Sequence, residues 1–223
     1  MLEIQGYKEL YEQERLKVYN MDCMELLKQV PDKYFDLAIV DPPYGIGDRL
    51  EKGGGKLKNT PMAKLYRQSS KWDNKTPDIQ YFNELFRTSK NQIIWGGNYF
   101  NLPPTRCIIS WDKLRYMHTL SHFELAWTSF DKVSKIFKKV SNDLERFHPT
   151  QKPVALYTWL LEKYAKPNFK IIDTHFGSGS HAIANHYYGS ELIACELDID
   201  YFKASIERIK KETRQLSFLQ GGH

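Results

Sequence analysis

The residues best suited to chemistry form the short stretch Asp41-Pro42-Pro43-Tyr44-Gly45. It follows an apolar run at 35–40, whose composition predicts a buried strand that ends in a tight turn. Two successive prolines fix the backbone and remove two N–H donors, so this turn neither extends the strand nor begins a helix. The turn offers the Asp41 carboxylate and the Pro42 carbonyl as neighbouring acceptors beside the Tyr44 ring. These groups suit a planar exocyclic amine such as that of adenine, which donates two N–H bonds and stacks.

A glycine-rich turn near the carboxyl end indicates a second site. A strand at 169–173 ends at Asp173 and is followed by Gly177-Ser178-Gly179-Ser180, a helix at 181–188 and a strand at 191–195 that leads to Glu196. This order is typical of adenosyl-cofactor sites, because glycines let the backbone approach the ligand and the later acid accepts hydrogen bonds from ribose hydroxyls. The same order also fits a nicotinamide- or flavin-dependent enzyme. Such an enzyme would give the Asp41 turn no chemical role, and the stretch would then be an ordinary turn.

Alternating helices and strands would position the two sites. We expect helices at 7–15, 22–29, 78–90, 148–165, 181–188 and 200–212. We expect strands at 16–21, 35–40, 92–95, 107–111, 123–128, 136–137, 169–173 and 191–195. This alternation predicts an α/β fold with a mostly parallel sheet covered by helices on both faces. At 223 residues, one domain spanning 1–223 is expected, with a mobile basic loop at about 45–78.

Composition narrows the class of protein. The three cysteines are scattered, which predicts neither disulfides nor a structural metal site. The sequence begins without a signal-peptide pattern and contains no apolar run of membrane-spanning length, so we expect a soluble cytoplasmic protein. The formal net charge of +5 permits a polyanionic partner. Basic residues concentrate at 49–75 and 132–139, where we expect loops.

With these motifs in place, the chain resembles the amino-directed DNA methyltransferases of the beta-class arrangement, and most closely the adenine-N6-specific enzymes of phage and prophage type. The resemblance covers nearly the whole sequence, including Trp95-Gly96-Gly97-Asn98-Tyr99-Phe100, Trp111-Asp112-Lys113, Phe123-Glu124-Leu125-Ala126-Trp127-Thr128 and His148-Pro149-Thr150-Gln151-Lys152-Pro153. In that family the Asp-Pro-Pro-Tyr turn precedes the glycine loop, a circularly permuted motif order that this chain shares. One departure concerns the glycine loop, where His175 replaces the usual phenylalanine and Phe176 follows it.

The resemblance implies a Rossmann-like methyltransferase fold and S-adenosyl-L-methionine as the cofactor. Nothing strand-like follows the last predicted helix, so the strand at 16–21 has to complete the cofactor half, which places Asp22 beside the cofactor or at a helix N-cap. The implied catalytic residues are Asp41, Pro42, Pro43 and Tyr44. The implied cofactor-binding residues are Asp22, Lys152, Asp173, His175, Phe176, Gly177, Ser178, Gly179, Ser180 and Glu196.

The implied partner is double-stranded DNA, with single-stranded DNA and RNA as alternatives. The basic residues expected to bind phosphates are Arg49, Lys52, Lys56, Lys58, Lys64, Arg67, Lys135, Lys138 and Lys139. A short insert at about 129–147 is the candidate target-recognition segment, and a homodimer or a role in restriction–modification fits the resemblance. Two alternatives to adenine methylation remain open, namely cytosine-N4 methylation and an inactive nucleic-acid-binding relative.

Overall fold

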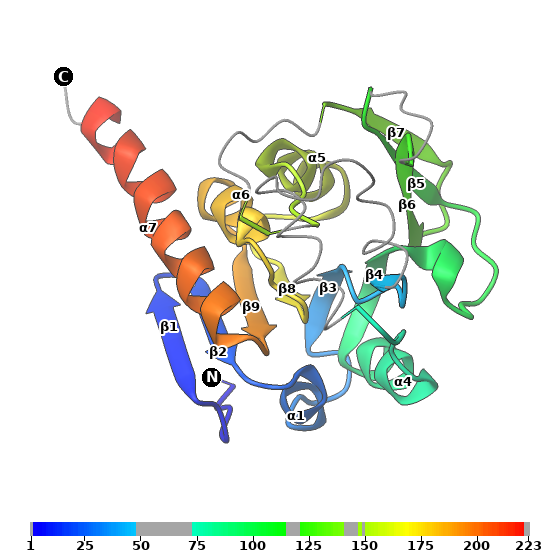
Figure 1. Cartoon of the computed structure of the whole chain (residues 1–223), viewed down its shortest axis with the longest axis horizontal. Helices are drawn as coiled ribbons and strands as arrows, with labels where there is room; N and C mark the ends of the chain where they lie inside the picture. Colours follow the sequence, from blue (N-terminus) through cyan, green and yellow to red (C-terminus); the bar gives the residue numbers. More distant parts are fainter. Residues whose placement is uncertain (1, 48–72, 115–120, 141–146, 149, 221–223) are drawn as a thin grey trace.

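A long mixed sheet forms the centre of the protein (Figure 1). The computed structural model describes residues 2–47, 73–114, 121–140, 147–148 and 150–220. In this part of the chain the sheet has the order β1-β2-β9-β8-β3-β4-β6-β5-β7. Its strands are β1 (Glu9–Gln13), β2 (Leu16–Asn20), β3 (Phe35–Val40), β4 (Ser89–Trp95), β5 (Ile108–Asp112), β6 (Phe123–Thr128), β7 (Lys135–Lys138), β8 (Lys170–Asp173) and β9 (Glu191–Glu196). The central strands β2, β9, β8, β3 and β4 are parallel, whereas β1 and β6 pair antiparallel with their neighbours.

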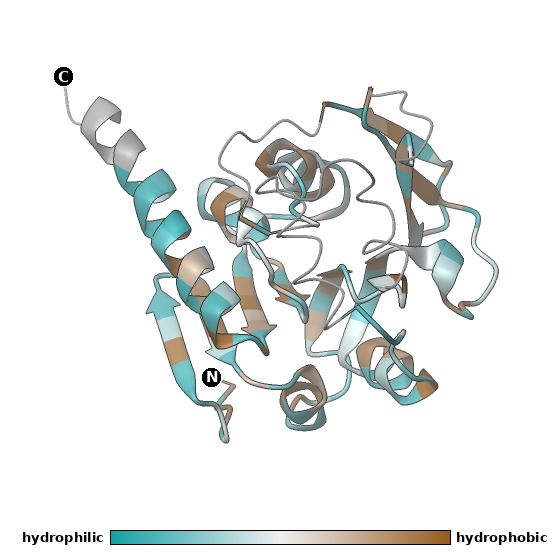
Figure 2. Cartoon of the chain, in the orientation of Figure 1, coloured by the Kyte–Doolittle hydropathy of each residue, from teal (hydrophilic) through white to brown (hydrophobic). Residues whose placement is uncertain are grey.

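Helices cover both faces of this sheet, as the alternation of the sequence predicts. They are α1 (Cys23–Lys28), α4 (Ile79–Thr88), α5 (Val154–Tyr164), α6 (Ser180–Tyr188), α7 (Ile199–Gln220) and the 3₁₀ turn η1 (Gly97–Tyr99). In β3, Leu37 and Ile39 belong to the core shared with α5, α6 and α7, whereas Ala38 and Val40 belong to the core shared with α1 and α4. Figure 2 shows apolar residues gathered in the central strands, while α7 is mainly hydrophilic. The α/β architecture is therefore confirmed.

The predicted helix at 7–15 is wrong. Residues Glu9–Gln13 form β1, which pairs antiparallel with β2 in the register Glu9↔Asn20 to Gln13↔Leu16. The ladder hydrogen bonds offered by β2 outweigh the weak helical pattern of a short segment. Three boundaries also differ by two residues or more. Ser89 and Lys90 already belong to β4, α5 begins at Val154 instead of 148 because Pro153 is its N-cap, and α7 continues to Gln220 instead of ending near 212.

The predicted strand at the amino terminus occupies the place expected for it. β2 runs parallel to β9 with Leu16 opposite Leu192 and Asn20 opposite Glu196. Asn20 also donates its side-chain amide to the carbonyls of Glu196 and Leu197 at 2.8 and 3.1 Å. These bonds join the amino-terminal strand to the carboxyl-terminal half of the fold.

Candidate active site

The acidic residues predicted from the sequence lie together at the carboxyl ends of the central strands, which form one edge of the sheet. Asp41 directly follows β3, Asp173 ends β8, and Glu196 ends β9. These strands are parallel, so their carboxyl ends face the same side, where α/β proteins commonly bind ligands (Figure 1). Asp22 reaches the same edge because β2 is parallel to β9. The fold therefore unites the two stretches that the sequence places more than a hundred residues apart.

The Asp41 carboxylate is held at both of its oxygens. The Tyr44 hydroxyl donates to Oδ1 at 2.5 Å, and the Lys152 ammonium donates to Oδ2 at 2.5 Å. Asp73, which is buried, fixes the backbone of the turn by accepting the N–H of Gly45 at 2.8 Å. Burial raises the pKa of Asp41 above its ordinary value, and the Lys152 ammonium opposes this rise. The turn thus presents a carboxylate of fixed orientation before any ligand arrives.

Lys152 belongs to a row of alternating charges that was not predicted from the sequence. Its side chain is only 1% exposed, and its ammonium also lies 3.1 Å from Glu124 Oε2. The other Glu124 oxygen lies 2.6 Å from the Lys113 ammonium. Burial alone would raise the pKa of Glu124, but the two ammonium groups outweigh it and lower this pKa to about 2. The resemblance places Lys152 beside the cofactor, whereas the structure places its ammonium on Asp41.

Aromatic rings surround Tyr44. Its ring stacks on that of Tyr99 with centroids 4.9 Å apart and planes inclined by 10°. A Cβ on Gly96, whose φ is +71°, would come within 2.2 Å of the Tyr44 ring, so only glycine fits there. Tyr99 is 43% exposed and was not among the predicted site residues. A planar base entering beside Asp41 would therefore meet a pair of stacked tyrosines instead of the single ring expected from the sequence.

The glycine loop lies between β8 and α6. Gly177 and Gly179 have φ values of +54° and +75°, which L side chains rarely adopt. The Gly177 N–H donates to Glu196 Oε2 at 2.8 Å, and the Asp198 N–H donates to Oε1 at 3.0 Å. Burial raises the pKa of Glu196 to about 7, because these two hydrogen bonds offset only part of the cost of desolvation. A half-buried carboxylate beside this loop is well suited to hydroxyl groups of a ligand.

Asp173 organises the inner part of the same loop. Its carboxylate accepts the backbone N–H of His175 at 3.1 Å and shares a 2.9 Å hydrogen bond with His181 Nδ1. The His181 ring stacks on Tyr157 at 4.8 Å, and its Nε2 has no hydrogen-bond partner in the described part of the chain. His181 was not among the residues predicted from the sequence. Its position in the first turn of α6, directly after the glycine loop, could have indicated it.

The remaining predicted cofactor residues lie on or beside this loop. Burial lowers the pKa of His175 to about 4, so its imidazole is neutral at pH 7, and its Nδ1 pairs with the Thr174 hydroxyl at 3.0 Å. Phe176 is buried, and the hydroxyls of Ser178 and Ser180 lie 3.1 Å apart. The loop therefore offers backbone and hydroxyl groups without a positive charge on His175.

Asp22 has the capping geometry that the sequence analysis considered. Its carboxylate accepts the backbone N–H groups of Met24 and Glu25 at 2.8 and 3.4 Å, which makes it the N-cap of α1. The cap fixes the side chain at the same edge of the sheet as Glu196. The capping role is thus confirmed, and contact with a cofactor stays a prediction.

Only three of the predicted phosphate-binding residues belong to the described part of the chain. Lys135 and Lys138 are exposed on the edge strand β7, and Lys139 is exposed directly after it. β7 pairs in parallel with β5, so this basic segment contains a strand as well as the expected loop. The other predicted residues, which lie outside the described residues, are Arg49, Lys52, Lys56, Lys58, Lys64 and Arg67.

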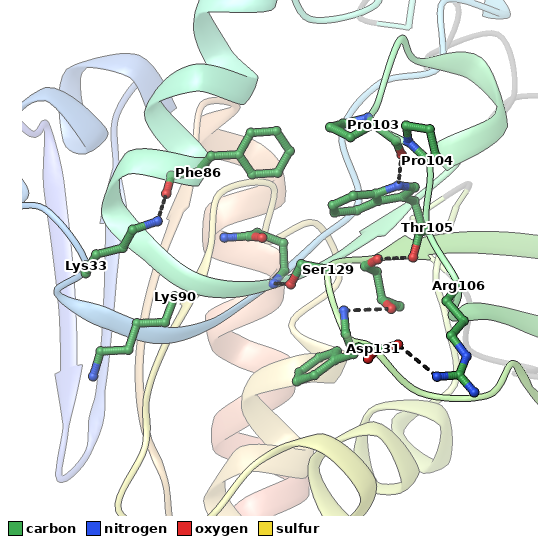
Figure 3. Close-up of a pocket in the computed structure, with 13 residues that line it drawn as sticks. Lys33, Phe86, Lys90, Pro103, Pro104, Thr105, Arg106, Ser129 and Asp131 are labelled. Carbon is green, nitrogen blue, oxygen red and sulfur yellow. Dashed lines mark hydrogen bonds and ion pairs between the residues drawn. The ribbon is translucent and has the colours of Figure 1, made fainter.

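A pocket of about 430 Å³ lies toward the opposite end of β4 and includes none of the predicted site residues (Figure 3). Its cations already have partners, because Lys33 donates to the Phe86 carbonyl and Arg106 pairs with Asp131 at 3.0 Å. Across the described residues, no group of three or more histidine, cysteine or acidic side chains is arranged to hold a metal ion. None of the helices described is both long and apolar enough to span a membrane.

Comparisons with known proteins agree with this geometry. The chain is 22% identical over 219 residues to the putative methylase YubD of Escherichia coli, with 87% of this chain and 90% of that protein covered. It is 23% identical over 266 residues to the type II methyltransferase M.ScaI of Streptomyces caespitosus, with 94% and 86% covered. Both relatives match over most of their own length.

Solved structures show the same fold. The complex of M1.HpyAVI with SAM superposes with a TM-score of 0.56 at 18% identity, with 87% of this chain and 98% of that chain covered. The cytosine-N4-specific PvuII DNA methyltransferase superposes with a TM-score of 0.60 at 13% identity, with 94% and 96% covered. The sequence pattern of the N6/N4 methyltransferases, described as DNA methylase, matches residues 56–207, which is more than half of the chain. The protein therefore belongs to the N6/N4 DNA methylase family, whose members use S-adenosylmethionine.

Proposed function

We propose that the protein transfers a methyl group from S-adenosylmethionine to the N6 amine of adenine in DNA. The observation that carries this proposal is the Asp41 carboxylate, fixed by Tyr44 and Lys152 at the sheet edge that also holds the glycine loop. Aspartate at this position favours adenine, because the cytosine-N4 branch of the resembling enzymes more often has serine there. Cytosine-N4 methylation is the nearest alternative, since the same turn can accept any exocyclic amine.

The cofactor site fits an adenosyl group. Gly177 and Gly179 carry no side chains, so the backbone can approach a ligand at these two positions, and the Glu196 carboxylate lies beside Gly177 to accept ribose hydroxyls. When bound, S-adenosylmethionine supplies a methyl group on a positively charged sulfur, which an amine can attack. The residues proposed to hold it are Asp22, Asp173, His175, Phe176, Gly177, Ser178, Gly179, Ser180 and Glu196.

The Asp41 turn makes the amine a better nucleophile. The lone pair of the N6 amine is delocalised into the adenine ring, so the amine reacts poorly when it is unassisted. The Asp41 carboxylate and the Pro42 carbonyl accept its two N–H bonds, which favours a pyramidal nitrogen and stabilises the positive charge that develops on it. Pro43 keeps the turn rigid, while Tyr44 orients Asp41 and lines the base site. No covalent bond between the enzyme and the base is required.

The target amine is buried inside paired DNA, so the base has to leave the helix before reaction. Base flipping costs a few kcal/mol, which stacking on aromatic side chains can offset. Tyr44 and the exposed Tyr99 are placed to provide such stacking. The basic residues of the two predicted segments then bind phosphates and hold the strand.

The decisive experiment supplies isotopically labelled S-adenosylmethionine and unmethylated DNA to the protein, followed by mass spectrometry of the nucleosides. An Asp41→Ala variant is the control. Label in N6-methyladenine that disappears in the variant supports the proposal. Label in N4-methylcytosine changes the target to cytosine. Label in no nucleoside despite measured cofactor binding contradicts methyl transfer to DNA and favours RNA as the substrate first, and the inactive binding protein if RNA is not labelled either.

DNA binding through β7 has its own test. Replacing Lys135, Lys138 and Lys139 by alanine removes exposed positive charges from one edge of the sheet. The slope of log affinity against log salt concentration is negative, and each lost phosphate contact should reduce its magnitude by about 0.9. Lys203→Ala and Lys210→Ala on α7, where the side chains are 60% and 39% exposed, serve as controls. An equal loss in both sets would show a general charge effect and contradict a specific role for β7.

A further inference from the structure

The Lys152 ammonium occupies a place that cofactor binding does not explain. Its Nζ lies 2.5 Å from Asp41 Oδ2, 3.1 Å from Glu124 Oε2 and 3.5 Å from the Tyr44 hydroxyl. Its side chain is 1% exposed, and the Trp95 ring lies 5.1 Å from its Nζ. Two of these partners, Asp41 and Tyr44, belong to the proposed target-base site.

Burying such a cation is costly unless its partners are well placed. The effective penalty is several kcal/mol for each buried ion, and an apolar residue of similar size would often stabilise a fold equally well. Here the charges alternate along Asp41, Lys152, Glu124 and Lys113, so that the row sums to zero. The row is contributed by four separate segments and ends on the one carboxylate that the proposed reaction needs. Its position favours a functional role over a purely structural one.

We propose that Lys152 is a positioning residue for methyl transfer: it fixes Asp41 as an anion in the orientation that accepts the target amine, and Glu124 and Lys113 hold the ammonium in place. This inference rests on the proposed function and extends it to three residues. Lys152 and Tyr44 each donate to one oxygen of Asp41, so each oxygen keeps one further lone pair of fixed direction that can accept the incoming N–H bond. An unpaired carboxylate could rotate or take up a proton, and either change would weaken the acceptor.

The charges around Asp41 predict how each substitution changes the pH dependence. The groups that act on Asp41 are the Lys152 ammonium, the Glu124 carboxylate, the Tyr44 hydroxyl and the nearby Tyr157 and Asp73. Beyond burial, Lys152 lowers the pKa of Asp41 and Glu124 raises it. Loss of Lys152 should therefore raise the pKa of Asp41, whereas loss of the Glu124 charge should lower it. Since transfer requires the carboxylate, the acidic limb of the rate profile should follow these shifts.

The test measures kcat at saturating DNA and S-adenosylmethionine across pH, together with the cofactor dissociation constant by calorimetry. For Lys152→Met we expect kcat to fall about 10²-fold and its acidic limb to move upward by about 1–3 pH units. Glu124→Gln should move the limb downward, and Lys152→Arg should restore part of the rate. Cofactor affinity should stay within about threefold of the unsubstituted protein in all three variants, a change below 1 kcal/mol.

Lys90→Met is the matched control. Lys90 pairs with Asp36 at 2.7 Å across β4 and β3, near the opposite end of the same two strands, and takes no part in the proposed site. Its loss should leave kcat and the pH profile unchanged. A Lys152→Met variant with normal kcat but weaker cofactor binding would overturn the proposal in favour of a cofactor role. An unshifted acidic limb in both Lys152→Met and Glu124→Gln would overturn it as well.

A separate measurement distinguishes failure of this inference from failure of the proposed function. The pKa of Asp41 can be followed by carbon NMR of its carboxyl group in the unsubstituted protein, Lys152→Met and Glu124→Gln. If the protein methylates no DNA but the Asp41 pKa rises in Lys152→Met and falls in Glu124→Gln, the proposed reaction is wrong, and the role of Lys152 in positioning Asp41 is supported. If DNA is methylated but this pKa does not respond, the proposed function stands and the role of Lys152 is wrong. Glu124→Gln, which preserves side-chain shape, provides the test if Lys152→Met does not fold.

Discussion

Two groups of acids at the same sheet edge are stabilised in opposite ways. On the side of the proposed target base, Asp41 and Glu124 are paired with the ammonium groups of Lys152 and Lys113. On the side of the proposed cofactor site, the Glu196 carboxylate is held by backbone N–H groups, and its pKa rises to about 7. In the first arrangement each carboxylate already faces an ammonium group. The second holds a half-buried acid that hydroxyl donors of a ligand could stabilise further, which suits the proposed binding and release of a cofactor.

The largest effect on methyl transfer should come from removing the negative charge of Asp41. Asp41→Asn keeps the size of the side chain but gives up its negative charge, and we expect methyl transfer to fall about 10³-fold because a developing positive charge loses its partner. Calorimetry should find unchanged affinity for S-adenosylmethionine. A comparable loss of cofactor affinity would mean that the two acid groups do not act separately.

A substitution in the glycine loop should affect the other side. In Gly179→Ala, a Cβ would lie 3.2 Å from Ile209 and 3.3 Å from Ser205, at a residue whose φ is +75°. The strain of about 1–2 kcal/mol should lower the melting temperature. The distorted loop should also weaken cofactor binding about tenfold, which corresponds to about 1.4 kcal/mol.

Gly189→Ala is the control for that substitution. Gly189 has a similar φ of +86°, but its Cβ would meet no atom within 4 Å, and it ends α6 away from the loop. We expect a comparable fall in melting temperature and unchanged cofactor affinity. Equal effects of both substitutions on affinity would show that general stability, and not the loop, controls binding.

A smaller effect should follow pH on the cofactor side. The ionised form of Glu196 accepts hydroxyl donors, so cofactor affinity should fall several-fold as pH decreases through about 7. Because this pKa lies above the ordinary value of 4.5, the carboxyl contributes stability below pH 4.5 that is lost as pH rises through about 7. Glu196→Gln should remove both dependences, measured by calorimetry and by thermal unfolding between pH 5 and 9. A wild-type affinity that is constant across this range would contradict the assignment.

The smallest effect is expected at the residue that departs from the family pattern. His175 is neutral at pH 7 because burial lowers its pKa to about 4, so His175→Phe replaces one uncharged ring by another. Loss of the hydrogen bond to Thr174 should change cofactor affinity by no more than about threefold, which is less than 1 kcal/mol. A tenfold change in a binding titration would show that the imidazole itself contacts the ligand.

Much of the site followed from local patterns, and one important part did not. The apolar runs predicted that Asp41, Asp173 and Glu196 lie at the carboxyl ends of strands, and the structure has Asp41 directly after β3, Asp173 at the end of β8 and Glu196 at the end of β9. The predicted helix at 7–15 failed, since a short polar segment takes its structure from the strand beside it. Glu124 and Lys113 belong to two of the motifs on which the family resemblance rests, but nothing in those motifs indicates that the two residues pair with one another.

The sequence by itself determined the order of the elements from residue 16 onward, the rigid turn at Asp41 and the left-handed loop at Gly177 and Gly179. These features depend on interactions within a few residues, which proline, glycine and the spacing of apolar residues control directly. Only the tertiary structure decided that Lys152 meets Asp41, although 111 residues separate them in the chain. That contact depends on which strands are neighbours in the sheet and on a buried environment in which each charge must find its opposite.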